Sequence, residues 1–192
     1  MNGVFLKPDE LLAVLKAARA RGPREWCMIL FAYRHGMRAS EVCGLTLADV
    51  DMKGESVTIR RLKGSLCTTQ PLYRHRGQPL LDEMTALKAY LKERVADGSE
   101  YLFLSQKGGR LSRVQFYRIF QSIAQQAGLA ADKQHPHVLK HTLGSHLVAE
   151  NVNLALVKQA LGHRAISSTM VYVGVSDQQA AQEAQRAAMQ MF

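Results

Sequence analysis

Hydrophobic positions recur at helical spacing over most of this chain. In PDELLAVLKAARA the leucines and alanines share one face, which predicts an amphipathic helix over residues 8–20 that Gly22 and Pro23 terminate. Residues 24–35 are more uniformly apolar, which predicts a buried helix ended by Gly36. The same spacing, with Ser40 and Ser112 as N-caps, predicts further helices over residues 40–44, 81–95, 112–128, 137–151, 154–161 and 178–191.

The period changes from helical to alternating in one region. SVTIRRLK and LCTTQPL are rich in β-branched residues and flank a turn at Gly64, so we expect a two-stranded hairpin there. The sequence therefore predicts a mainly α domain with a small antiparallel β-sheet, an α+β fold built around one core.

Length and composition agree with one ordinary globular domain. The chain has 192 residues, of which 47% are hydrophobic and 21% charged. Its longest apolar run, residues 26–33, is far shorter than the roughly 20 residues that a spanning helix needs. The start MNGVFLKPDE has no signal-peptide pattern, so we expect a cytoplasmic protein without a membrane partner.

The charge balance is strongly basic. A formal charge of +9 favours a polyanionic partner such as nucleic acid, although a ribosome-bound or merely basic protein has the same composition. Basic residues concentrate at and just after the expected hairpin. We expect DNA contacts from four of them, Arg60, Arg61, Arg74 and Arg76.

Neither a disulfide framework nor a metal site is indicated. Cys27, Cys43 and Cys67 are odd in number and form no CxxC pair. His137 and His141 have the i, i+4 spacing of two metal ligands, but no HExxH glutamate or neighbouring cysteine completes a zinc site. We expect no metal and no cofactor.

Histidine, lysine and tyrosine gather in the last third of the chain. His137, Lys140 and His141 lie within little more than one helical turn, and His163 and Tyr172 follow a helix that Gly162 ends. Such groups suit chemistry on a phosphate, because a tyrosine nucleophile needs cations that stabilise the developing charge. Arg38 and Lys63 taken alone are equally compatible with ordinary surface positions.

Four separated motifs, in this order, resemble a known family: GMRASEVCGL, RLKGSLCTTQPL, HPHVLKHTLGSHL and LGHRAISSTMVY. They are similar to the catalytic domain of tyrosine recombinases, the phage integrase family, over residues 8–172. The short length and the second motif look most like the small invertases that flip fimbrial promoter segments. The resemblance implies a catalytic domain over residues 1–176 without the family's separate N-terminal core-binding domain.

The resemblance also implies a tail helix over residues 177–192. Its stripe of Ala180, Ala184, Ala187 and Met191 either docks on a neighbouring protomer or covers its own core. The implied partners are double-stranded DNA, three further protomers in a homotetramer on two DNA sites, and accessory DNA-bending proteins.

The resemblance assigns a role to each candidate residue. Tyr172 is the expected nucleophile, Arg38 the clamp on the phosphate and Lys63 the general acid. His137 and His163 are expected to donate to the phosphate, with His137 also taking the tyrosine proton. Glu41 and His141 are expected to hold these groups in place.

Lys140 departs from the family pattern, which has arginine at this position. Lysine keeps the charge but loses the planar fork that grips a phosphate. The expected function is a site-specific DNA recombinase, either slowed by this change or reduced to a DNA-binding regulator that does not cleave. A strand-relaxing enzyme is a third alternative.

Overall fold

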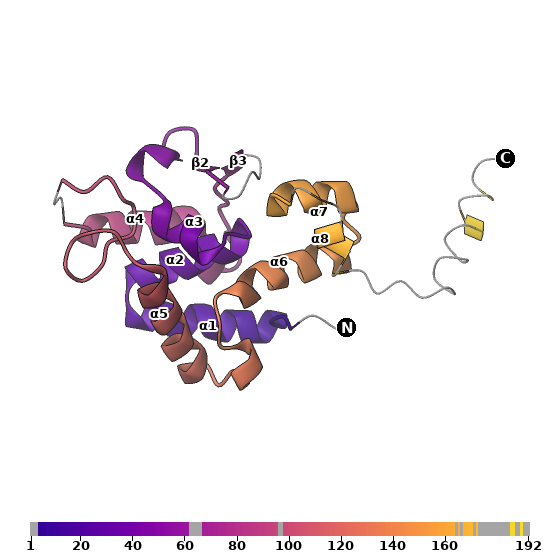
Figure 1. Ribbon diagram of the computed structural model, residues 1–192, viewed down its shortest axis with the longest axis horizontal. Coiled ribbons are helices and arrows are strands. Elements are labelled where there is room, and N and C mark those ends of the chain that lie inside the picture. The colour runs from indigo at the N-terminus through magenta and orange to yellow at the C-terminus, as the bar shows by residue number, and fades with distance from the viewer. Residues whose placement is uncertain are drawn as a thin grey trace.

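Helices are the main secondary structure of the described residues, as Figure 1 shows. The computed structural model describes residues 4–61, 67–95, 98–163, 165, 167–170, 172, 185, 186 and 189. The helices are α1 (Pro8–Arg21), α2 (Pro23–Arg34), α3 (Ala39–Gly44), α4 (Glu83–Glu93), α5 (Arg113–Gln126), α6 (His137–Ala149), α7 (Leu154–Leu161) and α8 (Ser167–Met170). Three single 3-10 turns are Leu47–Asp49, Pro79–Leu81 and Ala131–Lys133.

Helix α2 is the centre of the core, as its uniformly apolar sequence predicted. All residues of α2 from Glu25 to Tyr33 are buried, and the helix packs against α1, α4 and α6. At its C-terminal end His35 forms a fully buried pair with Glu83, with Nε2 and Oε1 2.9 Å apart, which ties α2 to the start of α4. The helix that leads to Arg38 is therefore fixed from several sides.

The sheet has three strands within the described residues, not the two that alternation predicted. Strands β1 (Val50–Asp51), β2 (Ser56–Ile59) and β3 (Thr68–Pro71) are antiparallel and lie in this order. Val57 pairs with Gln70 and Val50 pairs with Val57 on the other side. A two-residue strand is too short to show alternation, which is why β1 escapes detection in the sequence.

Two helix starts differ from the expected ones. Helix α3 begins after Arg38 rather than at Ser40, because the Glu41 carboxylate accepts the Arg38 N–H at 2.8 Å and takes the capping role. Helix α4 begins at Glu83, since Asp82 caps it by accepting the Thr85 N–H at 2.7 Å. The Ser112 cap of α5 is confirmed, with Oγ accepting the Gln115 N–H at 3.1 Å.

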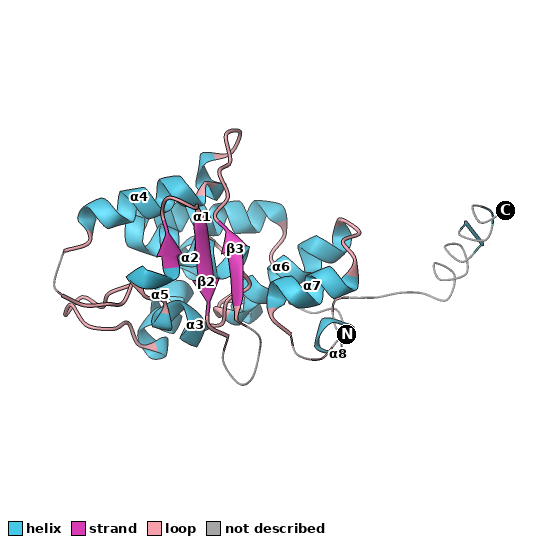
Figure 2. Cartoon of the chain, turned by 90° about the horizontal axis from the view of Figure 1, so that it is seen from above, coloured by secondary structure: helices cyan, strands magenta, loops and turns pink. Residues whose placement is uncertain are grey.

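Helices α6 and α7 lie beyond β3, on the opposite side of the sheet from α4 (Figure 2). Helix α7 ends as its Gly162 predicted, since that residue has φ +63° in the left-handed region that favours glycine. The expected residues Lys63, Ala180, Ala184, Ala187 and Met191 lie outside the described part of the chain. None of the described helices is long and apolar enough to cross a membrane.

Candidate active site

Arg38 stands at the exposed rim of the site and is held by Glu41. Its Nη1 donates to Glu41 Oε1 at 2.9 Å, while 37% of the Arg38 side chain and none of the Glu41 side chain is exposed. Burial raises the pKa of Glu41, but the hydrogen bond from the Arg38 N–H and the charge of Arg61 outweigh it, so the pKa lies below its ordinary value. Glu41 is therefore an anion that orients the arginine, in keeping with the supporting role expected of it.

Arg61 occupies a place that the sequence did not predict. Its side chain has no exposed surface, and it donates inward to Glu41 Oε2 at 3.1 Å and to three backbone carbonyls. A guanidinium buried in this way cannot reach DNA, so the expected DNA contact at Arg61 is corrected. The other three arginines of that set, Arg60, Arg74 and Arg76, are exposed.

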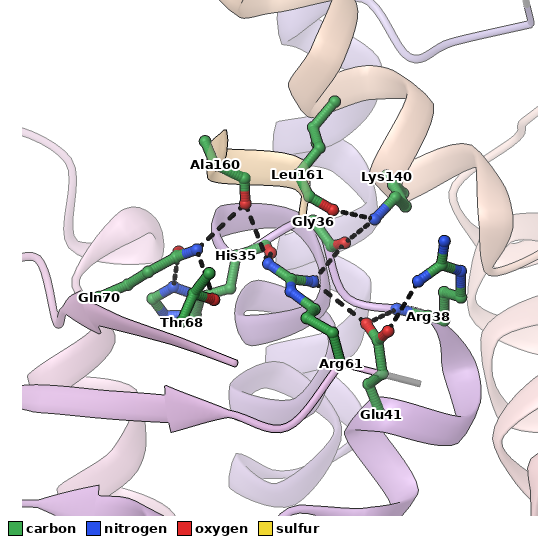
Figure 3. A network of polar contacts seen from close by, with 10 residues as sticks. All are labelled: His35, Gly36, Arg38, Glu41, Arg61, Thr68, Gln70, Lys140, Ala160 and Leu161. Carbon is green, nitrogen blue, oxygen red and sulfur yellow. Dashed lines mark hydrogen bonds and ion pairs between the residues drawn. The ribbon is translucent and has the colours of Figure 1, made fainter. Parts of the chain in front are cut away.

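Lys140 is also turned into the protein. Only 2% of the residue is exposed, and Nζ donates to the carbonyls of Gly36 at 2.8 Å and Leu161 at 2.6 Å (Figure 3). Burial and the charge of Arg61 lower the pKa of Lys140 to about 7, against the opposing effect of Glu41. A lysine that reaches one phosphate oxygen was one of the two outcomes that the sequence left open, whereas in the structure the Lys140 amine directs two N–H groups at backbone carbonyls.

The expected histidines and the tyrosine come together from α6 and from the chain after α7. The rings of His137 and His141 are 4.4 Å apart between centroids, and His141 lies 5.7 Å from Tyr172. His163 is stacked on Tyr172, with centroids 6.3 Å apart and planes at 12°. Within the described ranges no group of three or more His, Cys, Asp or Glu residues is arranged to hold a metal ion.

Both outer histidines are neutral at physiological pH. Burial, followed by the neighbouring charges of His141 and Lys140, lowers the pKa of His137 to about 4. Burial and the charges of Lys140 and Arg38 lower the pKa of His163 to about 4 as well. A neutral imidazole has one nitrogen that accepts a proton and one that donates a hydrogen bond.

Tyr172 packs closely on helix α6. A Cβ atom added to Gly144 would lie 2.6 Å from Cζ of the Tyr172 ring, so only glycine leaves room for the ring there. Burial raises the pKa of Tyr172 to about 12, although the charge of Arg38 acts in the opposite direction. The phenol is thus protonated in this state and needs a base to become a nucleophile.

Two site residues carry no sequence signal strong enough to single them out. Thr169 is fully buried, and its Oγ1 lies 3.0 Å from Nδ1 of His163, which leaves Nε2 as the nitrogen available to a substrate. Gly144 lies in the middle of α6, where a glycine normally weakens a helix. An unexplained glycine inside a helix next to the histidines was the one available hint of close packing.

A tyrosine beside histidines and a carboxylate-held arginine, carried by this mainly helical fold, defines the catalytic domain of a tyrosine-type site-specific recombinase. The chain belongs to the phage integrase family, which it matches over residues 4–179.

Known proteins are similar over most of the chain. The type 1 fimbriae regulatory protein FimB of Escherichia coli is 40% identical over 174 residues, which cover 88% of this chain and 82% of FimB. The XerH site-specific recombinase, solved bound to its difH substrate in a pre-cleavage complex, matches with TM-score 0.76 and 25% identity over 95% of this chain and 54% of XerH. The XerA recombinase has the same fold, with TM-score 0.79 and 24% identity over 97% of this chain and 66% of XerA.

Proposed function

We propose that this recombinase cuts and rejoins double-stranded DNA through a covalent bond between a 3′-phosphate and Tyr172. The observation that carries the proposal is the stacking of Tyr172 on His163 of the same chain, with His141 in edge contact with the same ring. A protomer that holds its own nucleophile among its own histidines cleaves the DNA strand that it binds, without borrowing a tyrosine from a neighbour.

The proposed reaction is a transesterification. The Tyr172 oxygen forms a bond to phosphorus, the bond to the 5′-oxygen breaks, and the 5′-oxygen leaves as a hydroxyl. Attack by the 5′-hydroxyl of a partner strand reverses these steps, so the bond energy is kept and no ATP is consumed.

The lowered histidine pKa values leave these imidazoles neutral at physiological pH, each with one nitrogen that can accept a proton. His137 is neutral at physiological pH and accepts the proton of Tyr172, whose own pKa of about 12 prevents spontaneous ionisation. His163 donates from Nε2 to a phosphate oxygen, because Thr169 occupies Nδ1. Lys63, which lies outside the described residues, supplies the proton to the 5′-oxygen in this scheme.

Arg38 is the proposed phosphate clamp. More than a third of its side chain is exposed, and Glu41 fixes one end of the guanidinium. A planar fork held in advance stabilises the charge that develops on the non-bridging oxygens without a reorganisation cost. With a pKa of about 7, the buried Lys140 is only partly protonated at neutral pH, so it adds positive charge near the site mainly below that pH.

The basic surface supports a DNA partner. Arg60, Arg74 and Arg76 are exposed around the sheet, and the net charge of +9 favours phosphate contacts. The proposed location is the cytoplasm, where DNA is available to a bacterial-type recombinase.

A covalent-adduct assay tests the central proposal. The protein is incubated with a duplex that carries the inverted repeats flanking its gene and a nick near the cleavage position, which traps the cleaved strand. We expect a protein–DNA adduct on a denaturing gel for the wild type and none for Tyr172→Phe. An absent wild-type adduct, or an equal adduct with Tyr172→Phe, would identify a DNA-binding protein that does not cleave.

Four protomers acting on two duplexes are proposed because recombination requires four strand cuts. A groove of about 480 Å³ between β3, α6 and α7, lined in part by Leu143, Leu147 and the exposed Leu156, suits the apolar stripe of a neighbour's tail. Truncation after Ser176 should abolish cooperative DNA binding while single-site binding persists. Equal cooperativity in a gel-shift titration would place the tail on its own protomer.

Accessory DNA-bending proteins are proposed as further partners, because two sites on one molecule must be brought together. The test compares DNA inversion by the purified protein with and without added host extract. Equal efficiency in the two reactions would contradict this requirement.

A further inference from the structure

The turn after helix α2 and the last turn of helix α7 meet beside the active site. Helix α2 ends at Arg34 and helix α7 at Leu161. The carbonyls of His35 and Gly36, just beyond α2, and those of Ala160 and Leu161, in the last turn of α7, accept hydrogen bonds from Arg61 and Lys140 (Figure 3). The terminal carbonyls of a helix have no partner inside the helix and carry its negative partial charge. Without side-chain donors, these buried carbonyls would be left unsatisfied.

Arg61 satisfies both ends at once. Its Nη1 donates to the Gly36 carbonyl at 3.0 Å, and its Nη2 donates to the His35 carbonyl at 2.8 Å and to the Ala160 carbonyl of α7 at 2.9 Å. Glu41 Oε2, 3.1 Å from Nη1, neutralises the guanidinium. Its fully buried side chain therefore joins residues 35–41 to the end of α7.

The fit around Arg61 is close. A Cβ atom at Gly162 would lie 2.7 Å from Nε and 2.9 Å from Cδ of Arg61, so the α7 end rests directly on the arginine side chain. Gln70 supports the same end from β3 by donating to the Ala160 carbonyl at 3.1 Å. The position of the α7 terminus is thus set by side chains of the sheet.

Both bridged segments lead straight into proposed catalytic residues. Gly36 is two residues before Arg38, and Gly162 is directly followed by His163. We propose that Arg61 is a positioning residue for strand cleavage, which sets the separation of Arg38 and His163 by joining the C-termini of α2 and α7. The proposal rests on the proposed function of the site, and it replaces the direct DNA contact that the sequence suggested for Arg61.

Neighbouring arginines provide a matched pair for the test. Arg60 has 71% of its side chain exposed and pairs with Asp49, whereas Arg61 is buried. Removing a charge that contacts phosphate reduces the slope of log Kd against log salt by about 0.9. With a non-specific duplex, Arg60→Gln should lower that slope and weaken binding, whereas Arg61→Gln should leave the slope unchanged.

Cleavage at saturating DNA gives the second readout. Misplacing a catalytic group by about 1 Å costs roughly 100-fold in rate, so we expect Arg61→Gln to cleave roughly 100-fold more slowly than the wild type. Arg61→Lys should cleave roughly tenfold faster than Arg61→Gln. If Arg61→Gln only destabilised the fold, the loss of cleavage rate would instead follow the unfolded fraction and disappear well below the melting temperature. A slope reduced as in Arg60→Gln, or wild-type cleavage by Arg61→Gln, would overturn the proposal.

A third readout does not depend on activity. In protein labelled with ¹³C-histidine, the NMR signal of the His163 imidazole is assigned as the one that is missing in His163→Gln. This signal should shift in Arg61→Lys and stay in place in Arg60→Gln. This measurement can be made even if Arg61→Gln fails to fold. It also remains valid if the wild type forms no adduct, a result that would refute only the proposed cleavage. An unmoved His163 signal in Arg61→Lys would refute the positioning role.

Discussion

Replacing Lys140 with methionine tests the buried ammonium of the active site. Methionine has a similar length and no charge, so the substitution removes the hydrogen bonds to the Gly36 and Leu161 carbonyls without opening a large cavity. The charged groups that act on the lysine are Arg61, Glu41 and Arg38, and burial lowers its pKa from 10.5 to about 7. The folded protein therefore loses this proton at a lower pH than the unfolded chain.

The sign and size of the effect follow from proton linkage. Between the two pKa values the unfolded chain binds one more proton than the folded protein, so the contribution of Lys140 to stability rises with pH. For a lysine with these two values, stability should increase by roughly 2 kcal/mol between about pH 7 and about pH 9. His137 and His163 are present in both proteins, so their own titration cancels from the difference between the wild type and Lys140→Met.

Urea unfolding of both proteins at the two pH values provides the measurement. The stability of the wild type minus that of Lys140→Met should increase by that amount as the pH rises, whatever its value at neutral pH. A difference that is flat, or that decreases with pH, would refute the inference that burial dominates the environment of Lys140.

Two further substitutions address the geometry of the nucleophile. Gly144→Ala places a methyl group 2.6 Å from the Tyr172 ring, so the ring must move by roughly 1 Å. The rate of adduct formation should fall roughly 100-fold while DNA affinity in a gel shift is kept. An unchanged rate would show that the observed ring position is not the reactive one. Thr169→Val removes the partner of His163 Nδ1 while keeping the shape, and should slow cleavage roughly tenfold at saturating DNA; equal rates would exclude Thr169 from orienting the imidazole.

Local patterns predicted the helices well. The apolar run of α2, the Ser112 cap of α5 and the stop at Gly162 lie where the sequence placed them, because periodicity, capping and left-handed glycine positions depend on a few neighbouring residues. The four motifs carried enough information to identify the family, as the match over residues 4–179 shows.

Short features with little local signal were missed or misplaced. Strand β1 has only two residues, and the cap of α3 is the Glu41 carboxylate rather than Ser40. Neither has a periodic signal that could distinguish it from a turn.

The sequence by itself determined which residues form the helices and which chemical groups are present for phosphate chemistry. Only the tertiary structure decided that Arg60 faces solvent while Arg61 and Lys140 are buried between the ends of α2 and α7. Adjacent arginines are equivalent in a basic stretch of sequence. They differ in the fold because carbonyls from the turn after α2 and from the last turn of α7 meet beside one of them, and buried acceptors need donors.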